Sequence, residues 1–210
     1  MLDVHAPRSG INGVRDFFLH LFTITIGLLI ALALEAGAEA IHHRHQRQEA
    51  ETLIRREIQN NLAQLRDGAP VATAEHHQMT AVLQTLEDRA QSQPGVLHEN
   101  DFIFQEAPLQ DAAWRTANST GAVTYMDYAE VERFSDAYKE QALFQTIEEQ
   151  ALEDYLELLP ILSHPGNGGI VTPEAAKDAI PYTRRIVAHL SGMLAVGAGT
   201  VGTYEAALKQ

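Results

Sequence analysis

An uninterrupted apolar run at residues 17–34 constrains the fold of this chain more than any other feature. The run contains no Asp, Glu, Lys or Arg. At 1.5 Å per residue it forms a helix of about 27 Å, close to the roughly 30 Å hydrocarbon core of a bilayer. A helix in a soluble core normally presents one polar face to water, which this run lacks. We therefore expect a tail over residues 1–16 and a transmembrane helix over residues 17–40.

Two other interpretations of the run stay open. Arg8 and Arg15 would suit the positive region of a signal peptide, and Ala36-Gly37-Ala38 resembles its cleavage site. The run is longer than the about 7 to 15 apolar residues of most signal peptides, which favours a retained anchor. A hydrophobic tail that docks into a partner protein is the second alternative.

The charge of the remaining chain excludes one broad class of function. After residue 40 the chain holds 13 of its 15 Lys and Arg and 24 of its 28 Asp and Glu, a net charge of −11. Such a surface repels nucleic acid, so we expect no nucleic-acid partner. The chain has no cysteine, which excludes disulfides and thiolate ligands.

Basic residues on the two sides of the run leave its orientation open. Four arginines follow the run closely, against two before it. This excess leans towards a cytoplasmic C-terminal part, but long domains cross a membrane largely regardless of charge. The four arginines are Arg44, Arg47, Arg55 and Arg56.

The pattern after the anchor is helical. We expect a juxtamembrane stalk helix over residues 41–66, ended by Asp67-Gly68-Ala69-Pro70. An acidic helical bundle over residues 67–210 follows. Its expected helices span about 71–91, a segment from Asp111 to before Gly121, Asp127 to Pro160, and Thr172 to the C-terminus. A short extended or loop element is expected at Asp101–Phe104 and a Gly-rich loop at Ser163–Pro173.

Individual polar residues indicate where the helices of this bundle are capped and which side faces solvent. Asp111 and Thr172 are expected to cap helices, and Asp127 with Glu130 to form a capping box. The acidic stretch Glu130 to Glu157 is interpreted as a solvent-facing side. The segment Ile186 to Leu208 is less apolar than the first run and contains ionisable residues, so we expect a single span. The expected fold class is all-α, one N-terminal transmembrane helix continuing into an antiparallel helical bundle.

The first 45 residues carry a family resemblance. Asp16-Phe17-Phe18, the run from Ile26 to Leu32, Glu35 and His42-His43-Arg44-His45 resemble a group of uncharacterised bacterial single-pass membrane proteins. A segment centred on Trp114 also resembles one in that group. The resemblance implies the bacterial inner membrane and this architecture, but no catalytic residues.

Glu35, Glu39 and His42 form the most specific candidate metal site. Glu39 and His42 have the Glu-x-x-His spacing by which one helix offers two ligands to a di-iron centre. A solvated boundary between membrane and water is the favoured interpretation, because one span per subunit does not enclose such a centre. The other histidines, including His76 and His77, are interpreted as a solvated stripe.

Two further patterns are weaker. His20 lies within the apolar run and is a candidate ligand for a pigment or haem, although an interfacial position explains it more simply. Gly197 to Gly202 match the G-x-G-x-x-G dinucleotide fingerprint, but no strand precedes them and only eight residues follow. We expect no cofactor.

Three functions remain. The favoured one is a non-enzymatic structural or accessory subunit whose span packs through Gly27, Ala31 and Gly37 against membrane helices of other subunits or of a second copy. A respiratory or photosynthetic complex is a candidate host. The alternatives are a membrane-anchored sensor or ligand-binding module working through a partner, and an enzyme or metalloprotein.

Overall fold

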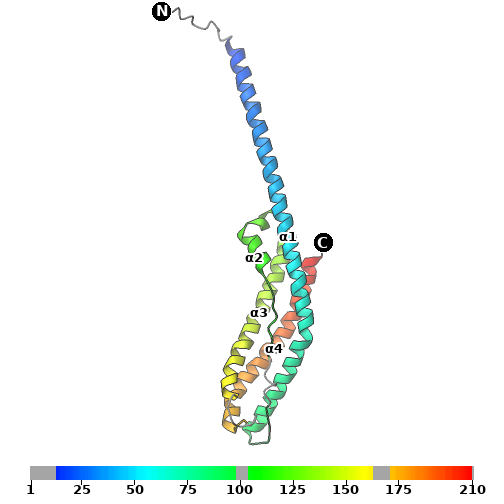
Figure 1. The fold of residues 1–210 in the computed structure, drawn as a ribbon, viewed down its shortest axis with the longest axis vertical. Coiled ribbons are helices and arrows are strands. Elements are labelled where there is room, and N and C mark those ends of the chain that lie inside the picture. The colour runs from blue at the N-terminus through cyan, green and yellow to red at the C-terminus, as the bar shows by residue number, and fades with distance from the viewer. Residues whose placement is uncertain (1–12, 98–103, 163–170, 210) are drawn as a thin grey trace, which may run out of the picture. The chain divides into compact units, whose positions relative to one another are not determined.

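The protein is helical throughout its regular structure. A computed structural model describes residues 13–97, 104–162 and 171–209. In these ranges the elements are α1 (Gly13–Ala90), α2 (Ala112–Ser119), the short 3-10 helix η2 (Ala122–Tyr125), α3 (Tyr128–Leu162) and α4 (Pro173–Leu208) (Figure 1). The predicted all-α fold class is confirmed. The loops predicted at Asp101–Phe104 and Ser163–Pro173 fall largely outside the described residues.

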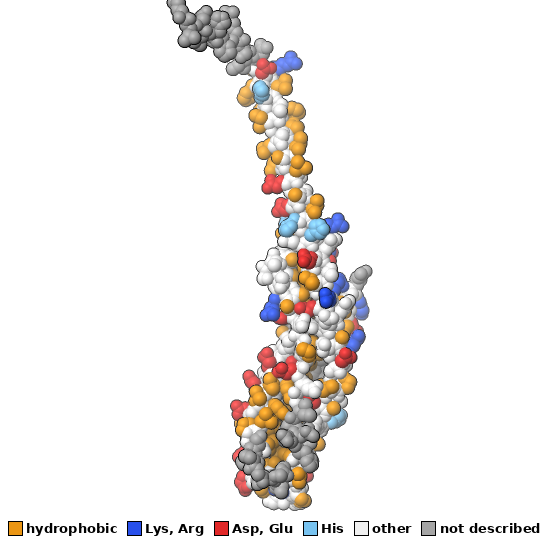
Figure 2. Space-filling view, in the orientation of Figure 1, with side chains coloured by type: hydrophobic (Ala, Val, Ile, Leu, Met, Phe, Trp, Pro, Cys, Tyr) orange, Lys and Arg blue, Asp and Glu red, His pale blue; other side chains and the backbone are white. Residues whose placement is uncertain are grey.

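The chain divides into two compact units, Met1–Gln46 and Arg47–Gln210, and α1 contributes residues to both. In the first unit, exposed hydrophobic side chains lie along the helix, with charged and histidine side chains towards both ends (Figure 2). Among the described helices, α1 and α4 are long and apolar enough to cross a membrane. No part of the apolar α1 segment is buried, whereas 22% of the corresponding α4 segment is buried in the protein.

Cross-helix pairs define the topology of the second unit. Glu57 and Asn61 of α1 pair with Tyr138 and Gln141 of α3 in the same order. Thus α1 and α3 run in the same direction, although the bundle was expected to alternate. Pairs between α1 and α4 follow the reverse order: they join Arg66 to Glu205 and Glu87 to Arg184. Thus α4 runs antiparallel to both.

All three long helices bury residues at alternating spacings of three and four. On α4 the buried positions recur from Ala176 to Ala207 with one gap between Met193 and Thr200, where the half-buried Gly197 takes the intervening place. The α3 series runs from Glu130 to Leu158. This seven-residue period keeps one seam of each helix against its neighbours. The α1 series includes Ile54, Ile58, Asn61, Leu65, Glu75, Met79, Val82 and Leu86.

The same period explains why one sequence prediction is wrong. The helix does not end at Asp67-Gly68-Ala69-Pro70, because α1 continues through Pro70 to Ala90. Proline weakens a helix by removing an N–H and crowding the preceding turn. Here the seam continues on both sides of Pro70, and its burial offsets that cost. The predicted helix 71–91 is therefore the end of α1, and residues 47–66 of the expected stalk belong to the bundle unit.

The helix ends differ from expectation in their capping. Thr172 caps α4 as predicted, since its hydroxyl accepts the Ala175 N–H at 3.2 Å. Asp111 occupies the N-cap of α2 but makes no side-chain cap, and it pairs with Arg115 instead. The predicted stop at Pro160 is two residues short, because α3 ends at Leu162.

The start of α3 is held to α1 by ion pairs. Asp127 pairs with Arg47 at 2.7 Å, and Glu130 pairs with Arg55. Glu130 is buried, and the Arg55 guanidinium also lies over the Phe134 ring, 5.4 Å from its centre. The two acidic residues expected to form a capping box therefore bind arginines of another helix.

Candidate functional site

A non-helical segment at residues 104–111, here called the strap, lies along the bundle. Its backbone N–H groups donate to three buried side chains. Gln105 donates to Glu75 at 2.9 Å, Ala107 to Glu148 at 2.7 Å, and Gln110 to Asn61 at 2.9 Å. Because Gln105 meets residue 75 and Gln110 meets residue 61, the strap runs opposite to α1. A chain segment with no strand partner needs such acceptors, since unpaired buried backbone groups are costly.

The polar network continues into the core at one end of the strap. The Asn61 amide also donates to the Gln110 carbonyl at 2.6 Å and to Gln141 Oε1 at 3.1 Å. The Tyr204 hydroxyl donates to the same Gln141 oxygen at 2.6 Å. One more carboxylate, Glu57, accepts from the Tyr138 hydroxyl at 2.6 Å and from the Ala113 N–H at 2.9 Å. These contacts fix the strap and α2 on the long helices.

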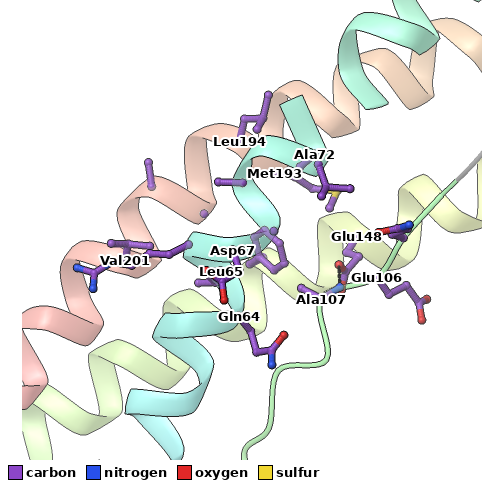
Figure 3. A pocket seen from close by; sticks show the side chains of 18 of the residues that line it. Gln64, Leu65, Asp67, Ala72, Glu106, Ala107, Glu148, Met193, Leu194 and Val201 are labelled. Atoms are coloured by element: carbon purple, nitrogen blue, oxygen red, sulfur yellow. Dashed lines mark hydrogen bonds between the residues drawn. The ribbon is translucent and has the colours of Figure 1, made fainter. Parts of the chain in front are cut away.

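A cavity of about 570 Å³ lies beside the strap, between α1, α3 and α4 (Figure 3). Its walls are mainly apolar and include Phe144, Met193 and Val201. Arg66, Asp67 and Glu106 line its exposed side. A cavity of this size and lining is typical of a site for a small molecule.

Small residues in the helix seams create this cavity. Gly68 and Ala72 continue the seven-residue series of α1, and Gly197 lies in the series of α4. A Cβ built at Gly68 meets no atom within 4 Å, whereas one at Gly197 lies 3.3 Å from the Phe144 ring. Helix α4 therefore approaches α3 closely through Gly197, and Gly68 leaves open space. Helices α1 and α4 thus both bring small seam residues to the cavity, whereas α3 brings Phe144 and Glu148.

Glu148 is the buried ionisable group in the cavity wall. Its side chain is buried with 6% of its surface exposed, and its Oε1 accepts the Ala107 N–H (Figure 3). Among the described residues its Oε2 has no hydrogen bond. Burial raises the pKa of Glu148 to about 7, an effect that the Ala107 N–H opposes and the nearby carboxylates of Glu106 and Glu75 reinforce.

The residues proposed from sequence all lie on the described part of α1 in the first unit. His20, Glu35 and His42 are exposed, as are Gly27, Ala31 and Gly37. A Cβ at either glycine meets no atom within 4 Å, so these positions are open to another helix.

Glu39 does not pair with His42, the histidine of the Glu-x-x-His pattern, but with the next residue, His43. Glu39 Oε1 lies 3.8 Å from His43 Nε2, one residue beyond His42. Among the described residues no group of three or more His, Asp or Glu side chains is arranged to hold a metal ion. The glycines of the dinucleotide fingerprint lie within helix α4, where the described chain offers no preceding strand.

The sequence interpretation missed the cavity residues. It placed Gly68 in a helix stop and Glu148 on the solvent side of its helix, but Glu130, Glu148 and Asp154 are all buried. The available signal was the seven-residue period. Extended through Pro70, that period places Gly68 and Glu148 on the seams, because each lies seven residues from another seam position, Asn61 and Gln141 respectively.

Comparison with known proteins adds no homologue: no family model, curated protein or solved structure matches the chain.

Proposed function

We propose that this protein is a non-enzymatic accessory subunit of a larger membrane complex, anchored by a single span at residues 17–34 in a bacterial inner membrane. The observation that carries the proposal is that this apolar segment is exposed on every side. In water such a surface is strongly unfavourable, and a bilayer relieves that cost. Helix α4, the other apolar helix, contributes nine buried residues to the protein core, which supports one span rather than two.

The proposed contact with partners runs through small residues of the span. Gly27 and Ala31 lie one helical turn apart and share a face, and Gly37 lies nearer the boundary. Small side chains let two membrane helices approach closely, which is the main source of their association. The partner is a helix of another subunit or of a second copy, and a respiratory or photosynthetic complex is a candidate host.

The use of the buried acids supports a non-enzymatic role. Glu57, Glu75 and Glu148 each accept a backbone N–H, so three of the buried carboxyl groups hold chain segments in place. Glu130 is committed to arginines of α1. We propose no catalytic residue and no cofactor.

Site-specific photo-crosslinking in intact membranes tests the proposal. A photoreactive amino acid replaces Ala31 in one variant and Ala33 in another, because Ala33 is an equally small residue that lies about 160° away around the helix. We expect protein adducts from position 31 and predominantly lipid adducts from position 33. The mass of the adduct distinguishes a second copy from another subunit. Absence of protein adducts at both positions would contradict the proposal.

The cavity favours a second candidate function, a membrane-anchored ligand-binding module that works through a partner. Its volume of about 570 Å³ and its mainly apolar lining are the observations that favour it.

A further inference from the structure

The bundle cavity has the features of a built binding site. One wall carries a carboxyl group that is more than nine-tenths buried, Glu148, with an oxygen that makes no hydrogen bond among the described residues. The opposite walls are apolar, with Met193 and Val201 of α4 among their residues. The remaining oxygen is not among the fully enclosed unpaired atoms of the described residues, so it keeps accessible surface and is available to a ligand head.

The charge of the residues around the cavity determines which polar group of a ligand it would attract. Asp67, Glu106 and Glu148 line it, and the basic lining residue is Arg66. Arg66 forms an ion pair with Glu205, which lies outside the lining. The site is therefore acidic overall, and an anionic head would meet repulsion while a cationic one would be attracted.

The volume and lining of the cavity determine which apolar part of a ligand it can hold. A cavity of about 570 Å³ with mainly apolar walls accepts a hydrocarbon chain or a small ring system. Gly68 leaves open space in the wall, and a larger side chain there has room to enter it.

We propose that this cavity binds a lipophilic amine, with its ammonium group at Glu148 and its hydrocarbon body between α1, α3 and α4. The ammonium donates to Glu148 Oε2 while Oε1 keeps the Ala107 N–H. A hydrogen bond between two charged groups in a buried site is stronger than one between neutral groups. The proposal does not depend on the accessory role, since it concerns only residues 64–201 of the bundle unit.

Methionine methyl NMR of the full chain in lipid nanodiscs tests the proposal. Met193 lines the cavity, whereas Met126 is buried elsewhere and serves as an internal control. The Met193→Leu variant assigns the signal. Octylamine, 1-octanol and octanoate are titrated as probes of equal chain length. We expect octylamine to shift the Met193 signal in a saturable way, with Met126 unchanged and octanoate at least tenfold weaker.

Two variants and their controls complete the test. Gly68→Leu fills the cavity and should abolish the shift, while Gly199→Leu, at another helical glycine with open space around its Cβ but outside the cavity, should preserve it. Glu148→Gln keeps an oxygen for Ala107 and should remove the preference for octylamine over 1-octanol, a change of about tenfold or more. Thermal unfolding checks that each variant is folded.

Three results of the NMR titrations would overturn parts of the proposal. Parallel shifts of Met193 and Met126 would show mere partitioning of the probe into lipid and would overturn the proposal. Equal binding of octanoate and octylamine would overturn the assignment of the ammonium to Glu148. Binding that survives Gly68→Leu would place the ligand elsewhere. None of these results bears on the photo-crosslinks, so the two proposals fail independently.

Discussion

Asn61 and Gln110 form a reciprocal pair: the Asn61 amide nitrogen donates to the Gln110 carbonyl at 2.6 Å, and its amide oxygen accepts the Gln110 N–H at 2.9 Å. A side chain of α1 thus offers the strap the donor and acceptor that a neighbouring strand would supply. Asn61 is 1% exposed, so its own amide depends on these protein partners rather than on water.

Replacing Asn61 should destabilise the bundle strongly. Asn61→Leu leaves the Gln110 N–H and carbonyl without this partner, and we expect the free energy of unfolding to fall by about 2 to 4 kcal/mol. Urea unfolding followed by circular dichroism measures the change. The control is Asn60→Leu at the exposed neighbouring position, which should change stability by less than about 0.5 kcal/mol. Equal effects at the two positions would contradict the clamped strap.

Glu148 should make the bundle less stable as the pH rises from about 4.5 to 7. The pKa of Glu148 rises from its ordinary 4.5 to about 7 on folding, so the folded state holds this proton more tightly than the unfolded chain. Stability from this group is complete below pH 4.5 and is lost as the pH rises through 7. Glu75, whose pKa burial also raises, acts in the same direction.

The variant Glu148→Gln isolates this contribution. The urea midpoint, measured from pH 4 to pH 8, should fall less steeply in Glu148→Gln than in the wild type. The exposed Glu149→Gln should retain the wild-type slope. A slope unchanged by Glu148→Gln would show that this carboxyl group does not titrate in the range.

The two cavity glycines should respond differently to alanine. Gly68→Ala adds a methyl group in open space and gains helix propensity, so we expect stabilisation by about 1 kcal/mol. Gly197→Ala gains the same propensity but places its Cβ 3.3 Å from the Phe144 ring, which should cancel much of the gain. Thermal unfolding of both variants at one pH measures the difference. A larger gain for Gly197→Ala would contradict the close approach of α3 and α4.

Loss of the buried acid at the start of α3 should loosen its attachment to α1. Glu130→Gln leaves the Arg55 guanidinium without its carboxylate, and we expect a loss of about 1 to 3 kcal/mol. Glu132→Gln changes an exposed acid two residues away and is the matched control. Hydrogen exchange of the first turns of α3 should increase only in Glu130→Gln. If both variants exchange alike, the ion pair does not anchor this helix.

The sequence predicted much of the fold because apolar periodicity is a local signal. The apolar run, the helical bundle and the Thr172 cap all follow from residues close together in the chain. Asp67, Gly68 and Pro70 indicate a helix end locally, whereas α1 continues through Pro70 because positions on both sides of it are buried. Tertiary burial overrides the local preference there.

The candidate site was harder to predict, because it depends on residues that meet only in the fold. Glu148 is one acidic residue among many in its helix, and its burial follows from the strap, whose Ala107 N–H it accepts. Gly68 and Gly197 are 129 positions apart, yet both line the same cavity. The sequence pattern of one helix does not show which buried positions of the other two helices lie beside it in the bundle.

Blue-native electrophoresis of membranes solubilised in mild detergent tests whether the protein is a subunit of a larger membrane complex. The full chain, detected by a tag, is predicted to migrate in a band much larger than one 23.1 kDa protomer with its detergent. The variant Gly27→Leu/Ala31→Leu should shift it towards the free protomer, whereas Ala33→Leu/Ala36→Leu, on the far face of the same helix, should not. Migration of the wild type only as a free monomer would contradict the proposed role as a subunit of a larger complex.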